Sequence, residues 1–163
     1  MNGVQSAVEQ HEPARFSIPI LLVAPRQDDR ERLQFLLGET AWDVVPSSWE
    51  DALVNYRRSS NPIVVCDIDM GCRPWRETMR QLRAARPDAC VIFIAEECAN
   101  GFREEVMHGG AFDLLTRPFT REDLLLTLLF AYSHCRAHWP KNSPRRAFQP
   151  VVCASVRLRE KER

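Results

Sequence analysis

The chain has 163 residues, 45% of them hydrophobic and 27% charged, which is the composition of an average globular protein. This length allows one ordinary domain with terminal segments and excludes a large multidomain enzyme. The 22 basic and 22 acidic residues cancel overall. They are unevenly placed, because the segment from Arg136 to Arg163 holds eight basic and two acidic side chains, a net charge of +6, which leaves −6 on residues 1–135.

The ends of the chain and its apolar runs indicate a cytoplasmic protein. The longest apolar stretch, Leu124–Tyr132, has nine residues, whereas about 20 are needed to span a bilayer. The N-terminal region carries Glu9 and Glu12 where a secretory signal needs an apolar run. We therefore expect a flexible leader over residues 1–17, one domain over residues 18–138, and a basic, disordered tail over residues 139–163.

Apolar runs alternate with amphipathic stretches along the chain. Residues 18–24 form a near-continuous apolar run, typical of a strand buried on both faces, and a helix that ends at Gly38 follows it. The pattern repeats, with further strands predicted over residues 42–45, 63–67, 89–95 and 113–116. The helices that follow these strands are predicted to end near Arg58, Ala85, Gly109 and Ala137.

Polar residues mark the places where several helices begin. Side-chain oxygens at a helix start accept hydrogen bonds from the free backbone N–H groups of the first turn. Three helix starts carry acceptors suited to such caps: Asp28 and Asp29, Ser47 with Glu50, and Thr120 with Asp123.

Five strands that alternate with helices predict an α/β fold in which the strands pair in parallel through right-handed crossovers. In such doubly wound sheets the functional site lies at the carboxyl ends of the strands. The residues at those positions are Ala24 and Pro25, Asp67, Ala95 and Glu96, and Thr116 and Arg117.

Two segments resemble the receiver domain of bacterial response regulators, the phosphoacceptor module of two-component signalling. The third predicted strand ends V-V-C-D-I-D-M-G, similar to the family's strand-Asp-x-x-Met-Pro pattern with Gly71 in place of the proline. Residues 110–119, G-A-F-D-L-L-T-R-P-F, are similar to the family's Gly-Ala-x-Asp-Tyr-Leu-x-Lys-Pro-Phe. The resemblance spans residues 18–132 and implies a flavodoxin-like (CheY-like) fold with strand order 2-1-3-4-5 and helices on both faces of the sheet.

The resemblance assigns Asp67 as the phosphoacceptor, but the positions that support its chemistry differ from the family pattern. In the family, an acidic pair after the first strand binds Mg²⁺ together with the acceptor carboxylate, and this chain has Ala24 and Pro25 there. The hydroxyl that contacts the phosphate, the aromatic switch residue and the lysine that pairs with the phosphate are replaced by Ala95, Leu114 and Arg117.

These replacements predict a degenerate receiver, or pseudo-receiver. Magnesium loses its main ligands, and Asp28 and Asp29 lie where the helix needs a cap, so we expect neither a bound metal nor another cofactor. An arginine can grip a carboxylate with two parallel hydrogen bonds, which a lysine cannot do. We therefore hypothesise that Arg117 pairs with Asp67, closes the pocket in one conformation and makes phosphoryl transfer slow or absent.

The last predicted helix carries more apolar residues than one buried face needs, because leucine or phenylalanine fills six of the seven positions from 124 to 130. The resemblance places a common dimer or partner surface at this helix. We therefore predict an interface that includes Leu125, Leu126, Leu129 and Phe130. The alternative is that the C-terminal tail folds back and covers these side chains.

Cysteine and histidine suggest further chemistry only weakly. The six cysteines, at positions 66, 72, 90, 98, 135 and 153, form no CxxC pair, and most lie in apolar runs. Free, buried thiols of a reducing compartment are expected rather than disulfides. His134 and His138 stand at i, i+4 around Cys135, a spacing that can hold zinc, but no further Cys/His cluster lies nearby in the sequence, so a polar helix end is expected.

We expect a stand-alone, atypical receiver domain that acts as a protein-interaction module. Its partners would be a histidine kinase or a downstream effector, or a second copy bound through the last helix, and no membrane is involved. One alternative is a single-domain regulator that still accepts phosphate on Asp67. Another is a regulator that contacts nucleic acid through its basic tail, although such a tail is more typical of a solvated end. No enzymatic activity is expected, because the chain lacks a glycine-rich phosphate loop after the first strand and a nucleophile–base pair.

Overall fold

The computed structural model describes residues 17–70, 73–96 and 100–138. The strands are β1 (Ile18–Val23), β2 (Trp42–Pro46), β3 (Ile63–Asp67), β4 (Cys90–Ala95) and β5 (Asp113–Thr116). The helices are α1 (Gln27–Leu37), α2 (Trp49–Arg58), α3 (Trp75–Ala85), α4 (Phe102–His108) and α5 (Arg121–His138). The predicted basic tail and all but the last residue of the predicted leader lie outside the described residues.

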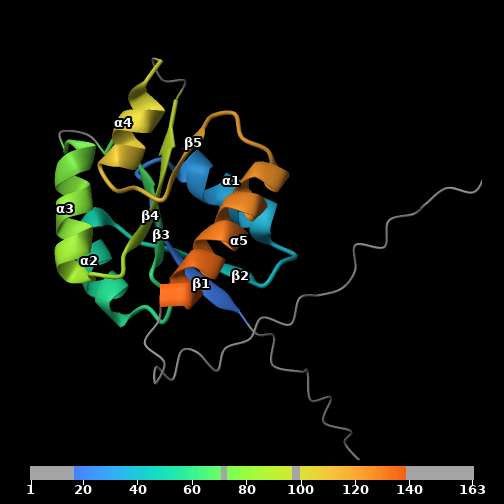
Figure 1. The fold of residues 1–163 in the computed structure, drawn as a ribbon. Helices are drawn as coiled ribbons and strands as arrows, with labels where there is room; N and C mark the ends of the chain where they lie inside the picture. Colours follow the sequence, from blue (N-terminus) through green and yellow to red (C-terminus); the bar gives the residue numbers. More distant parts are fainter. Residues whose placement is uncertain (1–16, 71–72, 97–99, 139–163) are drawn as a thin grey trace, which may run out of the picture.

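The five strands form one parallel sheet in the order β2-β1-β3-β4-β5, which confirms the predicted topology. Helices α1 and α5 cover one face of the sheet, and α2, α3 and α4 cover the other (Figure 1). The strand side chains alternate between these two layers. In β3, for example, Ile63 and Val65 pack under α1 and α5, whereas Val64 and Cys66 pack under the other three helices. The central strands are therefore buried on both faces, as their apolar composition predicts.

The start of α2 differs from the sequence prediction, and the start of α5 agrees with it. The N-cap of α2 is Ser48, whose Oγ accepts a hydrogen bond from the backbone N–H of Asp51 at 3.2 Å, so the predicted Ser47–Glu50 capping box is wrong. Ser47 is buried instead, because its Oγ accepts a hydrogen bond from Asn55 at 2.9 Å. At α5 the prediction is confirmed, since Thr120 and Asp123 exchange backbone and side-chain hydrogen bonds at 2.9 and 3.1 Å.

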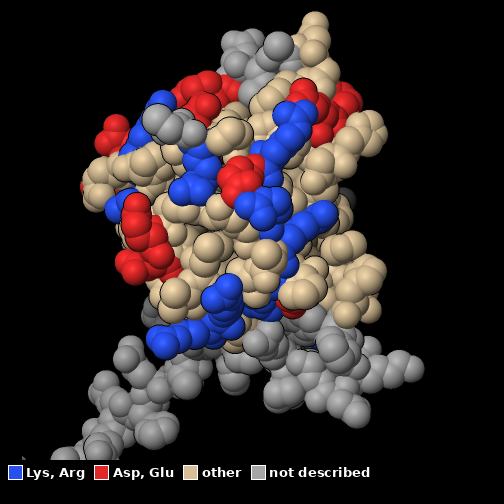
Figure 2. Space-filling model, turned by 90° about the vertical axis from the view of Figure 1, so that its left-hand side faces the viewer, with Lys and Arg blue, Asp and Glu red and all other residues tan. Residues whose placement is uncertain are grey.

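The outer face of α3 carries a group of arginines. Figure 2 views the molecule from the side of α2 and α3 and shows basic side chains crossing this face, with acidic ones beside them. Arg76, Arg80 and Arg83 are exposed, and their helical spacing puts them on one side of α3. Two of them are paired on the surface, Arg76 with Glu105 and Arg80 with Glu77.

No helix within the described residues combines the length and the apolar character that crossing a bilayer requires.

Candidate functional site

The carboxyl ends of β1, β3, β4 and β5 meet at one edge of the sheet and form the candidate site. Asp67 is the last residue of β3, and its neighbour across the sheet is Ile94 of β4. Arg117 directly follows β5, and its backbone N–H donates to the carbonyl of Ala95 at 2.9 Å. The parallel register therefore brings an acidic and a basic side chain from strands 50 residues apart into one pocket.

Arg117 lies between two aspartates. Its Nε and Nη2 donate to the two carboxylate oxygens of Asp29 at 3.1 and 2.7 Å, a two-pronged contact. The same Nη2 donates to Oδ2 of Asp67 at 2.8 Å. The structure thus contains the Arg117–Asp67 pair that the sequence analysis hypothesised. The bidentate contact, however, is the one between Arg117 and Asp29.

Asp67 has partners for both of its carboxylate oxygens. Oδ1 accepts a hydrogen bond from the backbone N–H of Asp69 at 2.8 Å, and Oδ2 accepts the bond from Arg117. The residue is only 2% exposed. A buried carboxylate is stable when it is hydrogen bonded and paired with a cation, and Arg117 supplies that cation here.

The surroundings keep the Arg117 guanidinium charged. Burial lowers the pKa of Arg117, but the hydrogen bonds that it donates to Asp29 and Asp67 outweigh this effect and raise the pKa above its usual value. At the rim of the pocket, Glu96 lies 3.8 Å from Nη1 of Arg117 and pairs with Arg26 at 2.7 Å. The Arg26 side chain is more than half exposed, so it forms an outer, hydrated ion pair in front of the buried one.

The arrangement places a protein cation where two acidic side chains converge. A divalent ion in such a pocket would need the same Asp29 and Asp67 oxygens that Arg117 already occupies. Among the residues that the structure describes, no group of three histidine, cysteine, aspartate or glutamate side chains could hold a metal ion. A phosphoryl group that approached Asp67 would likewise meet an oxygen that is already hydrogen bonded.

The role of Asp29 was missed by the sequence analysis. Asp28 and Asp29 were expected to cap α1, which is wrong, because the N-cap is Arg26 and both aspartates lie inside the first turn. Asp29 is buried together with Leu33 and Leu37, whereas Asp28 is exposed. The spacing i, i+4, i+8 of these three residues is the signal that could have placed Asp29 on the inward face of the helix.

The other positions singled out from the resemblance lie around this pocket without contributing side-chain oxygens. Ala24 and Ala95 are buried at the ends of β1 and β4, and Pro25 is exposed beside Ala24. The carbonyl of Ala24 accepts a hydrogen bond from Nε of Arg30 at 2.7 Å. Leu114, at the aromatic position, is fully packed in the core under α2, α3 and α4.

The predicted interface residues lie on α5, and three of the four are exposed. Leu126, Leu129 and Phe130 are 53, 53 and 65% exposed and follow one another at i, i+3, i+4 on one side of the helix. Leu125 is partly buried against the core, so only part of its side chain is accessible to a partner, and its place in the interface stays a prediction. Leu126 and Phe130 also line a groove of about 380 Å³ that runs between α5 and β5.

The predictions for cysteine and histidine can be compared with the described part of the chain. Cys66, Cys90 and Cys135 are free and buried, as predicted, and the other three cysteines lie outside the described residues. The imidazoles of His134 and His138 stack on each other with ring centres 4.4 Å apart, and Nδ1 of His138 is 2.8 Å from the carbonyl of His134. These contacts agree with the polar helix end that was expected at this position.

No protein-family model matches the sequence. The chain is 28% identical over 123 residues to the transcriptional regulatory protein ZraR of Salmonella typhimurium, a match that covers 75% of this chain and 28% of ZraR. A ZraR of Klebsiella oxytoca is 29% identical over 85 residues, 52% of this chain and 19% of that protein. The chain therefore spans less than a third of the length of these relatives.

Solved structures resemble the fold more completely. A response regulator receiver domain protein of Clostridium thermocellum matches 73% of this chain and 97% of its own with a TM-score of 0.65 and 22% identity. The beryllofluoride-activated NtrC4 receiver domain dimer matches 72% of this chain and 98% of its own with a TM-score of 0.65 and 21% identity. The described residues between 17 and 138 therefore have the CheY-like receiver fold of response regulators.

Proposed function

We propose that this chain is an atypical receiver domain of two-component signalling that acts by binding other proteins rather than by phosphate-driven switching. The observation that carries the proposal is the position of Arg117, which bonds to both Asp29 and Asp67. On this proposal the domain catalyses no reaction, holds no cofactor and works in the cytoplasm with a histidine kinase or a downstream effector as partner.

The chemistry of phosphoryl transfer explains why this contact matters. The reaction needs a free carboxylate oxygen as nucleophile and a cation that neutralises the transferred oxygens. In this pocket Oδ2 of Asp67 is engaged, and the cation is tethered to the chain. Transfer would require Arg117 to leave two carboxylates at once and to expose them without a counter-ion. Ala24 and Ala95 offer no side-chain oxygen to compensate.

A phosphodonor experiment tests the proposal directly. The full chain is mixed with a small phosphodonor and Mg²⁺, and its intact mass is followed with time. We expect the mass of the unmodified protein to persist. Phosphorylation of most molecules within minutes would contradict the proposal and would favour the ordinary single-domain regulator that uses Asp67.

Three variants make the result interpretable. Asp67→Asn removes the acceptor, so any mass increase that survives in this variant belongs to another residue. The double variant Ala24→Asp with Pro25→Asp introduces an acidic pair at the end of β1. Its Mg²⁺ binding reports whether these ligands are all that the pocket lacks for binding the ion. Arg117→Lys tests whether the guanidinium itself blocks the transfer, because an ammonium cannot maintain the bidentate contact to Asp29.

The exposed face of α5 supports a binding role. Leu126, Leu129 and Phe130 form a contiguous apolar surface next to the groove beside β5. Exposed apolar patches of this kind mark protein interaction sites. We assign this face to a second copy of the chain, an arrangement supported by the structurally similar NtrC4 receiver domain, which is a dimer. An effector protein is the alternative occupant.

A further inference from the structure

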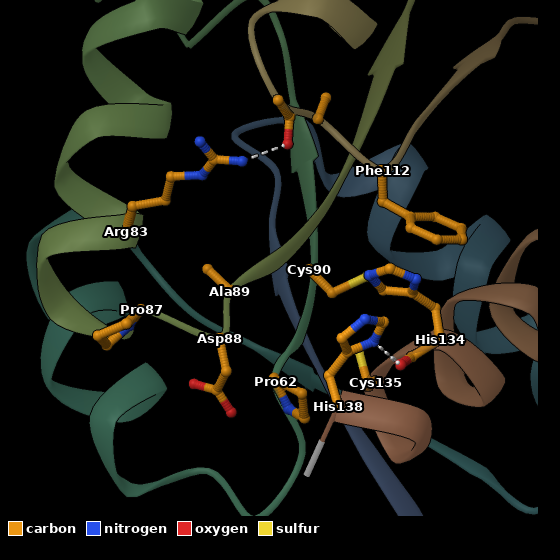
Figure 3. Close-up of a pocket in the computed structure, with 12 residues that line it drawn as sticks. Pro62, Arg83, Pro87, Asp88, Ala89, Cys90, Phe112, His134, Cys135 and His138 are labelled. Carbon is orange, nitrogen blue, oxygen red and sulfur yellow. Dashed lines mark hydrogen bonds between the residues drawn. The ribbon is translucent and has the colours of Figure 1, made fainter.

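A cavity of about 440 Å³ lies at the end of the sheet opposite to Asp67. It opens between the beginning of β4 and the last turns of α5, and its wall includes Cys90 from the strand and Cys135 from the helix (Figure 3). His134 and His138 also border it. The site is independent of the proposed function, because none of its lining residues belongs to the Arg117 pocket.

The two thiols belong to the same buried cluster. Cys90 and Cys135 pack in one layer of the core and border the same cavity, although 45 residues separate them in the sequence. Each residue is 4% exposed, so bulky reagents are excluded from both, while the cavity gives small molecules a route to the sulfur atoms. Cys66 differs, since it lies in β3 on the other face of the sheet and does not border the cavity.

Their interaction makes the two sulfurs chemically different. The interaction with Cys90 lowers the pKa of the Cys135 thiol, whereas the interaction with Cys135 and burial raise the pKa of the Cys90 thiol. The thiolate is the nucleophilic form of cysteine. Cys135 is therefore the sulfur suited to attack an oxidant, and Cys90 is the neighbour suited to resolve the product.

We propose that Cys90 and Cys135 form a reversible disulfide when a peroxide enters this cavity. The Cys135 thiolate attacks one peroxide oxygen, the O–O bond breaks, and the released hydroxide takes up a proton, which leaves a sulfenic acid on Cys135. The Cys90 sulfur then attacks the Cys135 sulfur, the S–O bond breaks, and water leaves with the proton of Cys90. In sum, two thiols and hydrogen peroxide give one disulfide and two waters.

The bond would connect β4 to the helix that carries the exposed apolar face. A cross-link between distant residues stabilises a fold mainly by restricting the unfolded chain. We expect the thermal midpoint to rise by about 5 °C or more on oxidation, and to return when a thiol reductant is added. Because the cavity lies at the opposite end of the sheet, the Arg117 contacts should be unchanged.

The test uses the full chain with Cys72, Cys98 and Cys153 replaced by serine, so that Cys66, Cys90 and Cys135 are its remaining thiols. The folded protein is treated with hydrogen peroxide in small excess, and its intact mass and peptide map are measured. We expect the loss of two hydrogen atoms per chain, one peptide that joins Cys90 to Cys135, and recovery of the original mass with dithiothreitol. Cys66→Ser should react in the same way.

Other results would overturn the inference. Addition of oxygen atoms to one sulfur without a cross-link, a bridge that involves Cys66, or no reaction of the folded protein would each contradict it. Cys90→Ser and Cys135→Ser should prevent the bridge, and circular dichroism establishes that each variant is folded. Where a serine variant fails to fold, Cys90→Ala or Cys135→Ala replaces it, since alanine leaves no unsatisfied hydroxyl in the hydrophobic cluster that contains both residues.

Discussion

At the scale of single residues, the choice of arginine over lysine decides what this pocket can do. A guanidinium presents several N–H donors in a planar fork, so that one side chain can serve two carboxylates. Arg117 uses this property by bonding Asp29 through two nitrogens and Asp67 through one of the same pair. The pocket thereby provides both buried acids with a cation that belongs to the chain itself.

The substitution Arg117→Ala should reduce the stability of the fold strongly. It would leave Asp29 and Asp67 facing each other without a cation, and removal of one partner from a buried ion pair costs about 3 kcal/mol. Urea denaturation followed by circular dichroism measures the change. The variant Arg117→Lys should lose less stability, because lysine retains the positive charge.

Arg26→Ala is the matched control for this prediction. Arg26 also pairs with an acidic side chain of the pocket, but that ion pair lies at the rim with both side chains more than half exposed. Exposed ion pairs contribute little to stability. Equal destabilisation by the two alanine variants would show that burial of the Arg117 pair is not what stabilises this edge of the sheet.

At the scale of secondary-structure elements, α5 has two apolar faces with different roles. Leu124, Leu128 and Ala131 are fully buried against the sheet, whereas Leu126, Leu129 and Phe130 project outward. Burial of the first group stabilises the fold, because apolar surface leaves water when the helix packs. The second group remains more than half exposed after folding, so further burial of its apolar surface would require a partner.

The triple variant Leu126→Ser, Leu129→Ser and Phe130→Ser should abolish self-association while leaving the fold intact. Sedimentation velocity over a range of protein concentrations measures the association, and thermal melting at low concentration measures the fold. A parent chain that stays monomeric at every concentration would contradict the assignment of this face to a second copy.

Helix α3 offers a pH-dependent contribution to stability at its exposed surface (Figure 2). Glu77 accepts hydrogen bonds from Nε and Nη2 of Arg80 at 2.8 and 2.6 Å and another from Gln81. These bonds lower the pKa of Glu77 from 4.5 to about 2. A carboxylate whose pKa is lowered by folding stabilises the protein above its unfolded pKa, and this contribution disappears as the pH falls through the folded pKa.

The substitution Glu77→Gln should therefore matter near neutral pH and not in strong acid. The stability difference between parent and variant should be full above pH 4.5 and should shrink as the pH falls toward 2. Denaturation at several pH values measures it, and added salt should weaken it because the pair is exposed. Carboxylates titrate between about pH 6 and about pH 2. A stability difference that stays constant across this range would refute the assigned role of the ion pair.

At the scale of the whole molecule, the repeat of apolar and amphipathic segments predicted five parallel strands, and the resemblance to receiver domains supplied their order. Ile63–Asp67 has the predicted bounds, because a strand buried on both faces needs a continuous apolar run. The edge strand Asp113–Thr116 also has the predicted bounds, although only Leu114 and Leu115 within it are buried. Helix starts were less predictable. Ser47 and Ser48 are adjacent and chemically equivalent as caps, and the choice between them depends on the tertiary contact of Ser47 with Asn55.

Part of the candidate site was predictable from the arrangement of the strands. Parallel pairing brings Asp67 and Arg117 to one edge of the sheet, which can be inferred from strand order alone. The contribution of Asp29 depends on the rotation of α1 about its axis, and a shift of the helix start by one or two residues would turn that side chain toward solvent. The bidentate grip on Asp29 is therefore a property of the packed structure.

The central claim is that Arg117 occupies the place of a divalent cation between Asp29 and Asp67. Calorimetric titration of the full, unmodified chain with Mg²⁺ tests this most directly. The account predicts no saturable binding through the millimolar range, and measurable binding in the Arg117→Ala variant, where both carboxylates become available. Saturable uptake of Mg²⁺ by the unmodified chain at millimolar or lower concentration would contradict it.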